Sequence, residues 1–212
     1  MERLFGLLRD KDHVIWDWNG TLLDDVEHAV ATINTLLAPR GLPSMNVDRY
    51  RNVFGFPIRA YYEACGFDLN AESFSELCER FVDTFMAKVY DCSLVPGSRE
   101  LLQALKLAGK TQSVLSATDQ ANLQKMVSGF ELEACFDFVF GIEDKLAASK
   151  VHRGHELLSV SGVDRDRTIL VGDTAHDLEV ASAIGIPVVL VAHGHQSAER
   201  LRRIHDNVVE CD

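Results

Sequence analysis

The sequence lacks several features that would place it in other classes of protein. No apolar run approaches the length of a membrane span, and residues 1–11 carry no signal-peptide pattern. The five cysteines are scattered without C-x-x-C spacing, which favours reduced thiols over a disulfide or zinc framework. The net charge is −11, and no Lys or Arg cluster offers a grip on a phosphate backbone. We therefore expect a cytoplasmic protein that binds neither membranes nor nucleic acid.

The composition is that of an ordinary globular chain, with 47% hydrophobic and 25% charged residues among 212. After residue 96, strand-like and helix-like segments alternate, which predicts an α/β fold with a doubly wound, Rossmann-like parallel sheet. A helix is expected from about residue 24 to residue 41, and from there to about residue 90 the apolar spacing stays helical, with no strand expected. We therefore predict an α/β core domain over residues 1–23 and 96–212, with a helical cap domain over 24–95.

The first chemically informative stretch is a short apolar run, 13–16, that ends at the carboxylate of Asp17. A Gly-Thr pair and a helical segment follow, so the run reads as a buried strand that brings Asp17 to its carboxyl end. Ligands bind at that edge in open α/β sheets. A buried carboxylate is costly unless it is paired, bound to metal or used in chemistry. The alternative is that Asp17 only caps the next helix.

A second group of acids lies in the segment 172–177, which reads Gly-Asp-Thr-Ala-His-Asp and follows a buried run at 168–171. Asp173 and Asp177 are four residues apart across a helix N-terminus, so both can face one polar cleft. Together with Asp17 they would place three carboxylates at neighbouring strand ends. Oxygen ligands that converge in this way suit Mg²⁺.

Two further polar residues stand at comparable positions. Ser116 ends a strand and offers a hydroxyl, and Lys150 opens a helix and offers a point charge for a phosphate. Each has a simpler explanation, since Ser116 could act as a cap and Lys150 could be a solvated helix start. Lys145 competes with Lys150, but Lys150 is preferred because backbone amides at a helix start help to hold an anion.

Taken in chain order, these residues resemble the motifs of the haloacid dehalogenase-like superfamily, in its phosphoglycolate phosphatase-like branch with a helical cap. The resemblance covers nearly the whole chain, and the insert lies between the first two motifs, where that family's cap belongs. The matching residues are Asp17-Trp18-Asn19-Gly20-Thr21-Leu22, Ser116, Lys150 and Gly172-Asp173-Thr174-Ala175-His176-Asp177.

The resemblance implies that Asp17 is a nucleophile that forms an aspartyl-phosphate. It also implies Mg²⁺ as cofactor, held by Asp17, the backbone carbonyl of Asn19 and Asp173, with Asp177 orienting or supplementing the shell. Ser116 and Lys150 would hold the phosphoryl oxygens. The residues expected to contact substrate are Trp18, Ser116, Ala117, Lys150 and, from the cap, Arg59, for which a solvated arginine is the equally weighted alternative.

One residue departs from the family pattern. Phosphatases of this family carry a second aspartate two residues after the nucleophile, where this chain has Asn19. That aspartate protonates the leaving oxygen and then activates the hydrolytic water, and an amide can do neither. Loss of general acid–base help typically costs roughly 10² to 10⁴ in rate. A slow enzyme, or one confined to good leaving groups, is the expectation.

The leading hypothesis is thus a Mg²⁺-dependent phosphatase of a small phosphorylated metabolite, present as a monomer or homodimer. Another hydrolase of the superfamily, such as one that cleaves phosphonates, and a phosphate-binding regulatory protein without turnover remain open. Of the histidines, His176 between the motif acids is a proton-transfer candidate. His193 and His195 read as a turn with solvated rings.

Overall fold

The computed structural model describes residues 2–143 and 150–210. Its main sheet has six strands in the order β5-β4-β1-β6-β7-β8, and every neighbouring pair is parallel. Taken along the chain without the two short strands of the insert, this is the 3-2-1-4-5-6 order of doubly wound dinucleotide-binding folds. The predicted fold class is confirmed. The strands are β1 (His13–Trp16), β4 (Thr111–Asp119), β5 (Phe138–Ile142), β6 (Thr168–Gly172), β7 (Val188–Val191) and β8 (Val208–Val209).

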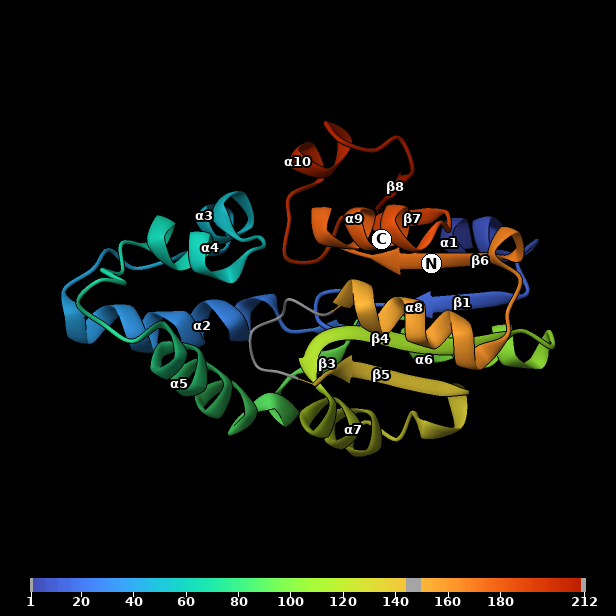
Figure 1. The fold of residues 1–212 in the computed structure, drawn as a ribbon, viewed down its shortest axis with the longest axis horizontal. Helices are drawn as coiled ribbons and strands as arrows, with labels where there is room; N and C mark the ends of the chain where they lie inside the picture. Colours follow the sequence, from blue (N-terminus) through green and yellow to red (C-terminus); the bar gives the residue numbers. More distant parts are fainter. Residues whose placement is uncertain (1, 144–149, 211–212) are drawn as a thin grey trace.

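Helices cover both faces of the sheet (Figure 1). They are α1 (Glu2–Leu8), α6 (Ser98–Leu107), α7 (Gln120–Gly129), α8 (Lys150–Ser161), α9 (Ala175–Ile184) and α10 (Ala198–Arg202), with 3₁₀ turns η3 (Glu133–Cys135) and η4 (Arg165–Arg167). Because successive strand residues point to opposite faces, Val14 and Trp16 enter one apolar cluster with α1, α6 and α7. Ile15 enters the other with α8 and α9. Central strands that are buried on both faces explain the uninterrupted apolar run of β1.

The insert between the first and second core strands is helical, as its spacing predicts. It contains α2 (Val26–Leu37), η1 (Ala38–Arg40), α3 (Val47–Val53), α4 (Ile58–Cys65), α5 (Phe74–Met86) and η2 (Val89–Asp91). In Figure 1 the arrows of the main sheet point toward this group of helices. The carboxyl ends of the strands, where ligands bind in such sheets, therefore face the insert.

Two short strands lie at the ends of the insert, outside the stretch from about 41 to 90 in which no strand is expected. The insert is bounded by β2 (Leu23–Asp24) and β3 (Ser93–Leu94), which form an antiparallel pair with Leu23 opposite Leu94. Strands of two residues are too short to show an alternating pattern in a sequence. Their pairing brings the beginning and the end of the insert together beside the main sheet.

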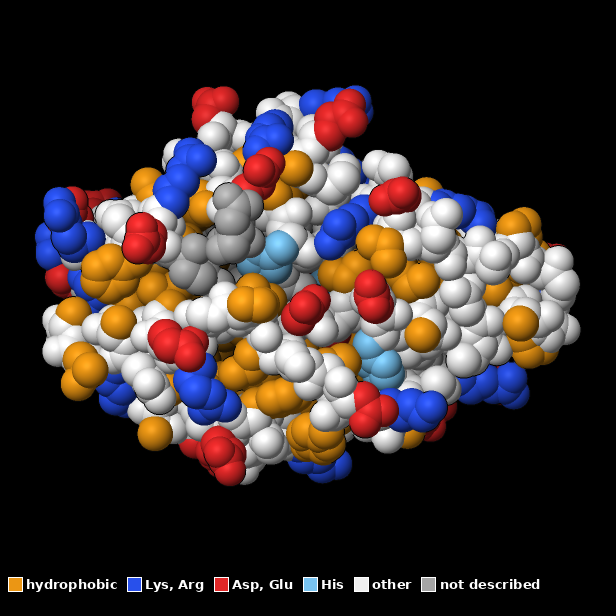
Figure 2. Space-filling model, turned by 180° about the vertical axis from the view of Figure 1, so that it is seen from behind, with side chains coloured by type: hydrophobic (Ala, Val, Ile, Leu, Met, Phe, Trp, Pro, Cys, Tyr) orange, Lys and Arg blue, Asp and Glu red, His pale blue; other side chains and the backbone are white. Residues whose placement is uncertain are grey.

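The described surface mixes charged and apolar side chains. On the face in Figure 2, acidic and basic side chains are interspersed, with apolar side chains between them. The large apolar side chains that are exposed belong to separate elements, and single exposed residues of this kind are normal. Among the described helices, none has the length and apolarity to cross a bilayer. The four described cysteines are free.

Candidate active site

The structure brings the residues of all four motifs together at the carboxyl edge of the main sheet. Asp17 follows β1, Ser116 lies near the end of β4, Lys150 begins α8, and Asp173 follows β6. The first three line one cavity of about 220 Å³ between the sheet edge and the insert. β1 lies between β4 and β6, so side chains from distant parts of the chain meet at this point.

Lys150 joins two of the acids. Its ammonium Nζ donates to Asp17 Oδ1 at 2.7 Å and to Asp177 Oδ1 at 2.6 Å. The lysine side chain is only 3% exposed, so both ion pairs are buried. A buried ammonium is stable only when it is paired and hydrogen-bonded. Lys150 is thus fixed at the bottom of the cavity; Lys145 lies outside the described residues.

Asp173 is held by groups from two other segments. Thr21 Oγ1 donates to its Oδ1 at 3.0 Å, and the backbone amide of His195 donates to its Oδ2 at 2.6 Å. Oxygens of Asp17, Asp173 and Asp177 lie within 4.8 Å of one another, and all three residues are buried. Three carboxylates at this spacing form the donor set that a hard divalent cation prefers.

The charges of this cluster are not balanced by the side chains present. Burial raises the pKa of Asp17 to about 8, with the neighbouring acids adding to the effect and Lys150 opposing it. Burial likewise raises the pKa of Asp173 to about 6. Asp177 differs: burial opposes ionisation, but contact with Lys150 outweighs it and the pKa is lowered. One lysine among three buried acids leaves negative charge that an additional cation would neutralise.

Close backbone packing fixes the acids in place. Asp177 Oδ2 accepts from the backbone amide and the hydroxyl of Thr174, which closes the first turn of α9. A Cβ at Gly172 would lie 2.2 Å from Asp177 Cγ, so only glycine fits there. Gly20 has a φ of +71°, and a Cβ there would lie 2.4 Å from Asp173 Oδ2. Steric contact therefore explains why both of these motif positions are glycine.

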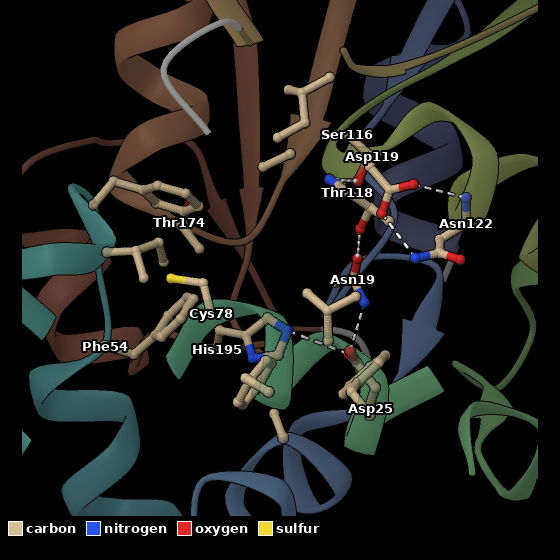
Figure 3. Close-up of a pocket in the computed structure, with 18 of the residues that line it drawn as sticks. Asn19, Asp25, Phe54, Cys78, Ser116, Thr118, Asp119, Asn122, Thr174 and His195 are labelled. Atoms are coloured by element: carbon tan, nitrogen blue, oxygen red, sulfur yellow. Dashed lines mark hydrogen bonds and ion pairs between the residues drawn. The ribbon is translucent and has the colours of Figure 1, made fainter. Parts of the chain in front are cut away.

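Asn19 is locked by two hydrogen bonds, which Figure 3 shows. Its Nδ2 donates to Asp25 Oδ2 at 2.7 Å, and its Oδ1 accepts from Thr118 Oγ1 at 2.8 Å. The amide matches these partners, because the Asp25 carboxylate can only accept a hydrogen bond and the Thr118 hydroxyl donates one. An aspartate in the same position would place two carboxylates in contact.

Asp25 belongs to a buried polar chain that the sequence did not reveal. Besides Asn19, Asp25 Oδ1 accepts from the Gly20 amide at 2.8 Å and lies 3.2 Å from His195 Nε2. The other ring nitrogen of His195 is hydrogen-bonded to the Tyr50 hydroxyl at 2.9 Å. Burial alone would lower the pKa of His195, but the charges of Asp25 and other acids raise it to about 9.

The interpretation of His193 and His195 as solvated is wrong. His195 is 4% exposed, and His193 is partly buried with Nε2 3.2 Å from the Thr21 carbonyl oxygen. His176 is also partly covered: its ring stacks on Phe56 of the insert, with centroids 4.3 Å apart, and Nδ1 contacts Glu179. The spacing of the histidines does not signal the contacts of His195 with Asp25 and Tyr50 or of His176 with Phe56, since these partners are remote in sequence.

Some of the residues expected to contact substrate lie at the cavity and others do not. Ser116, Ala117 and Lys150 line it, and Ser116 Oγ also accepts from the Thr118 amide at 3.1 Å. The Trp18 side chain is fully buried against Phe130, on the core side. The structure does not bring the Arg59 guanidinium into the cavity: the residue is exposed, and its guanidinium lies over the Phe74 ring at 4.7 Å.

Comparison with known proteins gives a consistent result. Residues 14–191 match the family model described as haloacid dehalogenase-like hydrolase. A phosphoglycolate phosphatase of Caulobacter vibrioides is 33% identical over 86% of this chain and 79% of its own length. A 5'-nucleotidase of Pseudomonas aeruginosa is 26% identical over 90% of this chain and 86% of its own.

A solved haloacid dehalogenase-like hydrolase from Streptococcus pneumoniae superposes with a TM-score of 0.81 at 21% identity, covering 96% of this chain and 95% of that one. This likeness shows the shared fold. The chain belongs to the haloacid dehalogenase-like hydrolase family. Within that family it is a hydrolase of the phosphoglycolate phosphatase-like kind.

Proposed function

We propose that the protein is a Mg²⁺-dependent phosphatase of small phosphorylated metabolites that acts through an aspartyl-phosphate on Asp17. The observation that carries the proposal is the buried cluster in which oxygens of Asp17, Asp173 and Asp177 lie within 4.8 Å of one another, with Asp17 also lining the cavity. An ordinary structural ion pair needs one acid for Lys150. Three acids around one lysine fit a site that receives a divalent cation and a phosphate.

The residues fit Mg²⁺ by their chemistry. Asp17, Asp173 and the backbone carbonyl of Asn19 would hold the ion, and Asp177 would orient Lys150 and supplement the shell. When bound, Mg²⁺ neutralises charge between an attacking carboxylate and a phosphate dianion. Hard oxygen donors are the correct set for it. The raised pKa values of Asp17 and Asp173 have their cause in burial without enough positive charge, which a cation would supply.

The steps on the protein side follow from the contacts. Lys150 holds one oxygen of Asp17, so attack on phosphorus would come from the other, while the ammonium steers a phosphoryl oxygen into line. Ser116 would donate its hydroxyl proton to a second phosphoryl oxygen. Most of the catalysis of phosphoryl transfer comes from such positioning and charge neutralisation. Water would then cleave the aspartyl-phosphate and free Asp17.

The proposed site has no acid at the position from which the family transfers the proton to the leaving group. Asn19 occupies the position from which the family's aspartate would protonate the leaving oxygen, and both ends of its amide are engaged. The proposed enzyme is therefore slow on esters of basic alcohols. Binding of phosphate without turnover is the second candidate, and the replacement at Asn19 is the observation that favours it.

The insert would act as a cap. It contributes Asp25, Tyr50, Phe54 and other residues to the cavity wall, so substrate would be enclosed between insert and sheet edge. Arg51 of the insert donates to the carbonyls of His193 and Gly194, and these bonds join insert and core beside the site. Exclusion of water by such an enclosure strengthens the electrostatic contacts inside.

The test is a screen of purified protein against a panel of phosphomonoesters, with Mg²⁺ and with EDTA. Mg²⁺-dependent release of phosphate that Asp17→Asn abolishes supports the proposal. Asp173→Asn should shift the Mg²⁺ titration to higher concentration, and calorimetric titration of Mg²⁺ should show the same weakening without turnover. Phosphate binding with no release of phosphate from any ester would favour the second candidate. Turnover that survives Asp17→Asn would refute the mechanism.

A further inference from the structure

The cavity has two unlike halves. The sheet edge contributes its polar groups, among them Ser116, Thr118 and Lys150, and the first part of the insert contributes Asp25. Beyond Asp25, every residue of the insert that lines the cavity is apolar or aromatic. They come from α2, α3, α4, α5 and the segment before α4, with Phe54, Tyr61, Phe81 and Met86 as representatives. Of the described lining residues, none in the insert is a lysine or arginine.

The helix α4 shows how this wall arises. Ile58, Tyr61 and Tyr62 are spaced along one face of the helix, and they line the cavity. Arg59 is on another face, is exposed, and is engaged by the Phe74 ring. Arg59, which follows Ile58, is thus turned away from the cavity, and Arg51, which follows Tyr50, is bonded to the carbonyls of His193 and Gly194.

The cations that do line the described cavity are already paired. Lys150 bonds Asp17 and Asp177, and His195 contacts Asp25. A further acid, Asp119, lines the cavity and caps α7 by accepting from the Asn122 amide at 3.1 Å. A carboxylate or second phosphate on the substrate would meet apolar side chains, neutral polar groups or another acid, but no unpaired cation among the described lining residues. Burial of an unpaired charge in such surroundings is strongly unfavourable.

The volume of the cavity sets the size of the occupant. An apolar cavity of about 150 Å³ holds a benzene ring. The cavity here measures about 220 Å³, which leaves room for one such ring together with the phosphoryl group at the sheet edge.

We infer that the substrate is a phosphate monoester whose leaving group is apolar, uncharged and about the size of one six-membered ring. This inference rests on the phosphatase function proposed above and narrows it. It sets this chain apart from its relative named phosphoglycolate phosphatase, because phosphoglycolate carries a small anionic leaving group for which the described wall has no partner.

The test compares esters whose alcohols are similarly basic, so that chemistry at the leaving oxygen changes little. Benzyl phosphate, ethyl phosphate, phosphoglycolate and benzyl phosphate with a para carboxylate are compared by kcat/KM in Mg²⁺. A single methylene in an apolar site is worth roughly 10- to 200-fold, so benzyl phosphate should exceed ethyl phosphate by about 10²-fold. The para carboxylate should remove about 10²-fold, because the charge is buried without a partner. Phosphoglycolate turned over as well as benzyl phosphate would overturn the inference and leave the phosphatase proposal standing.

Two charge variants and one control test whether the cavity wall determines the preference among substrates. Met86→Lys places an ammonium in the wall with a chain of similar length, at the end of α5 where the helix dipole favours it. It should raise the preference for the carboxylated ester by about 10-fold, because the wall then carries a positive charge opposite to that of the substrate carboxylate. Met86→Gln is the matched control and should not. Asp119→Asn removes the acid while keeping a residue that can cap α7, and it should move preference in the same direction as Met86→Lys. Unchanged preference in both charge variants would overturn the inference.

Binding separates this inference from turnover. Benzylphosphonate and phosphonoacetate resemble the two kinds of ester, but a P–C bond replaces the ester P–O bond that attack by Asp17 would break. If no ester is turned over, the phosphatase proposal fails, and calorimetry with these two probes decides the inference. Tighter binding of benzylphosphonate supports an apolar site. Tighter binding of phosphonoacetate would refute it.

Discussion

The substitution Asn19→Asp tests most directly what limits catalysis. It restores a carboxyl group at the family's acid–base position without changing side-chain size. The Thr118 hydroxyl can still donate to one of its oxygens, because that bond is made to Asn19 Oδ1 at 2.8 Å. The other oxygen takes the place of Nδ2, 2.7 Å from Asp25 Oδ2. Two carboxyl groups this close cannot both ionise, so they share a proton.

The expected gain follows from this geometry. A positioned acid contributes roughly 10² to 10⁴ in rate, and the lower end applies here because Asp25 competes for the shared proton. Benzyl phosphate and 4-nitrophenyl phosphate have rings of similar size but very different leaving groups. We expect Asn19→Asp to raise kcat for benzyl phosphate by about 10²-fold. For 4-nitrophenyl phosphate, whose leaving group needs no proton, the change should stay within a few-fold.

Asp25→Asn is the matched control, because it alters the same hydrogen bond without placing an acid at position 19. It should give no gain on benzyl phosphate. If wild type and Asn19→Asp have the same ratio of benzyl to 4-nitrophenyl rates, the reasoning is refuted and another group must move the protons. Intact peptide masses over residues 12–24 exclude an aspartate formed by deamidation at Asn19-Gly20. That reaction should be slow in the folded chain, because the attacking Gly20 amide donates to Asp25 Oδ1 at 2.8 Å.

Three further predictions follow from other contacts. Asp17→Asn should lower turnover by about 10⁴-fold or more, as loss of a nucleophile does, with an unchanged far-UV spectrum; near-wild-type turnover would contradict it. Orthovanadate with Mg²⁺ should protect both the sheet edge and the insert from hydrogen exchange, and protection confined to the core would mean that the insert does not close. Burial lowers the pKa of His13 to about 4 from 6.5, so the folded state resists a proton that the unfolded chain accepts. The contribution of His13 to stability should therefore be complete above pH 6.5 and decrease by about 3 kcal/mol towards pH 4, at roughly 1.4 kcal/mol per pKa unit. Urea unfolding should show a shallower pH dependence in His13→Gln.

The sequence predicted the parts of the site that stand directly at strand ends. Asp17 and Asp173 follow apolar runs that can only be central strands, and the edge they share is fixed by parallel topology. The helical insert was predictable because its apolar spacing continues over several turns. In each case, burial of one face of a helix or of both faces of a strand determines both the apolar pattern in the sequence and the place of the element in the fold.

Other parts of the site depend on contacts that no local pattern carries. Asp25 reads as an acid in the first turn of a helix. Its bond to Asn19 joins residues six apart that no regular spacing links, and its contact with His195 forms only when the insert and the loop after β7 meet. β4 runs on to Asp119 past the polar Ser116, because Asp119 pairs with Ile142 beyond an irregularity in the ladder. That continuation, which the end of the apolar run concealed, places Thr118 next to Asn19.

The antiparallel pairing of β2 and β3 has a consequence for how the gene could change. Leu23 and Leu94 are partners across the pair, so the chain leaves the core and returns to it one strand spacing apart, about 5 Å. A two-residue Asn-Gly turn can span such a gap, and the entropy of closing the loop between these points depends only weakly on what lies between them. An evolving gene could therefore lose, lengthen or exchange this segment while the sheet stays intact. A chain shortened in that way would lack the apolar wall opposite Asp17, and the sheet edge would be open to phosphate groups on large partners, such as a phosphorylated protein side chain.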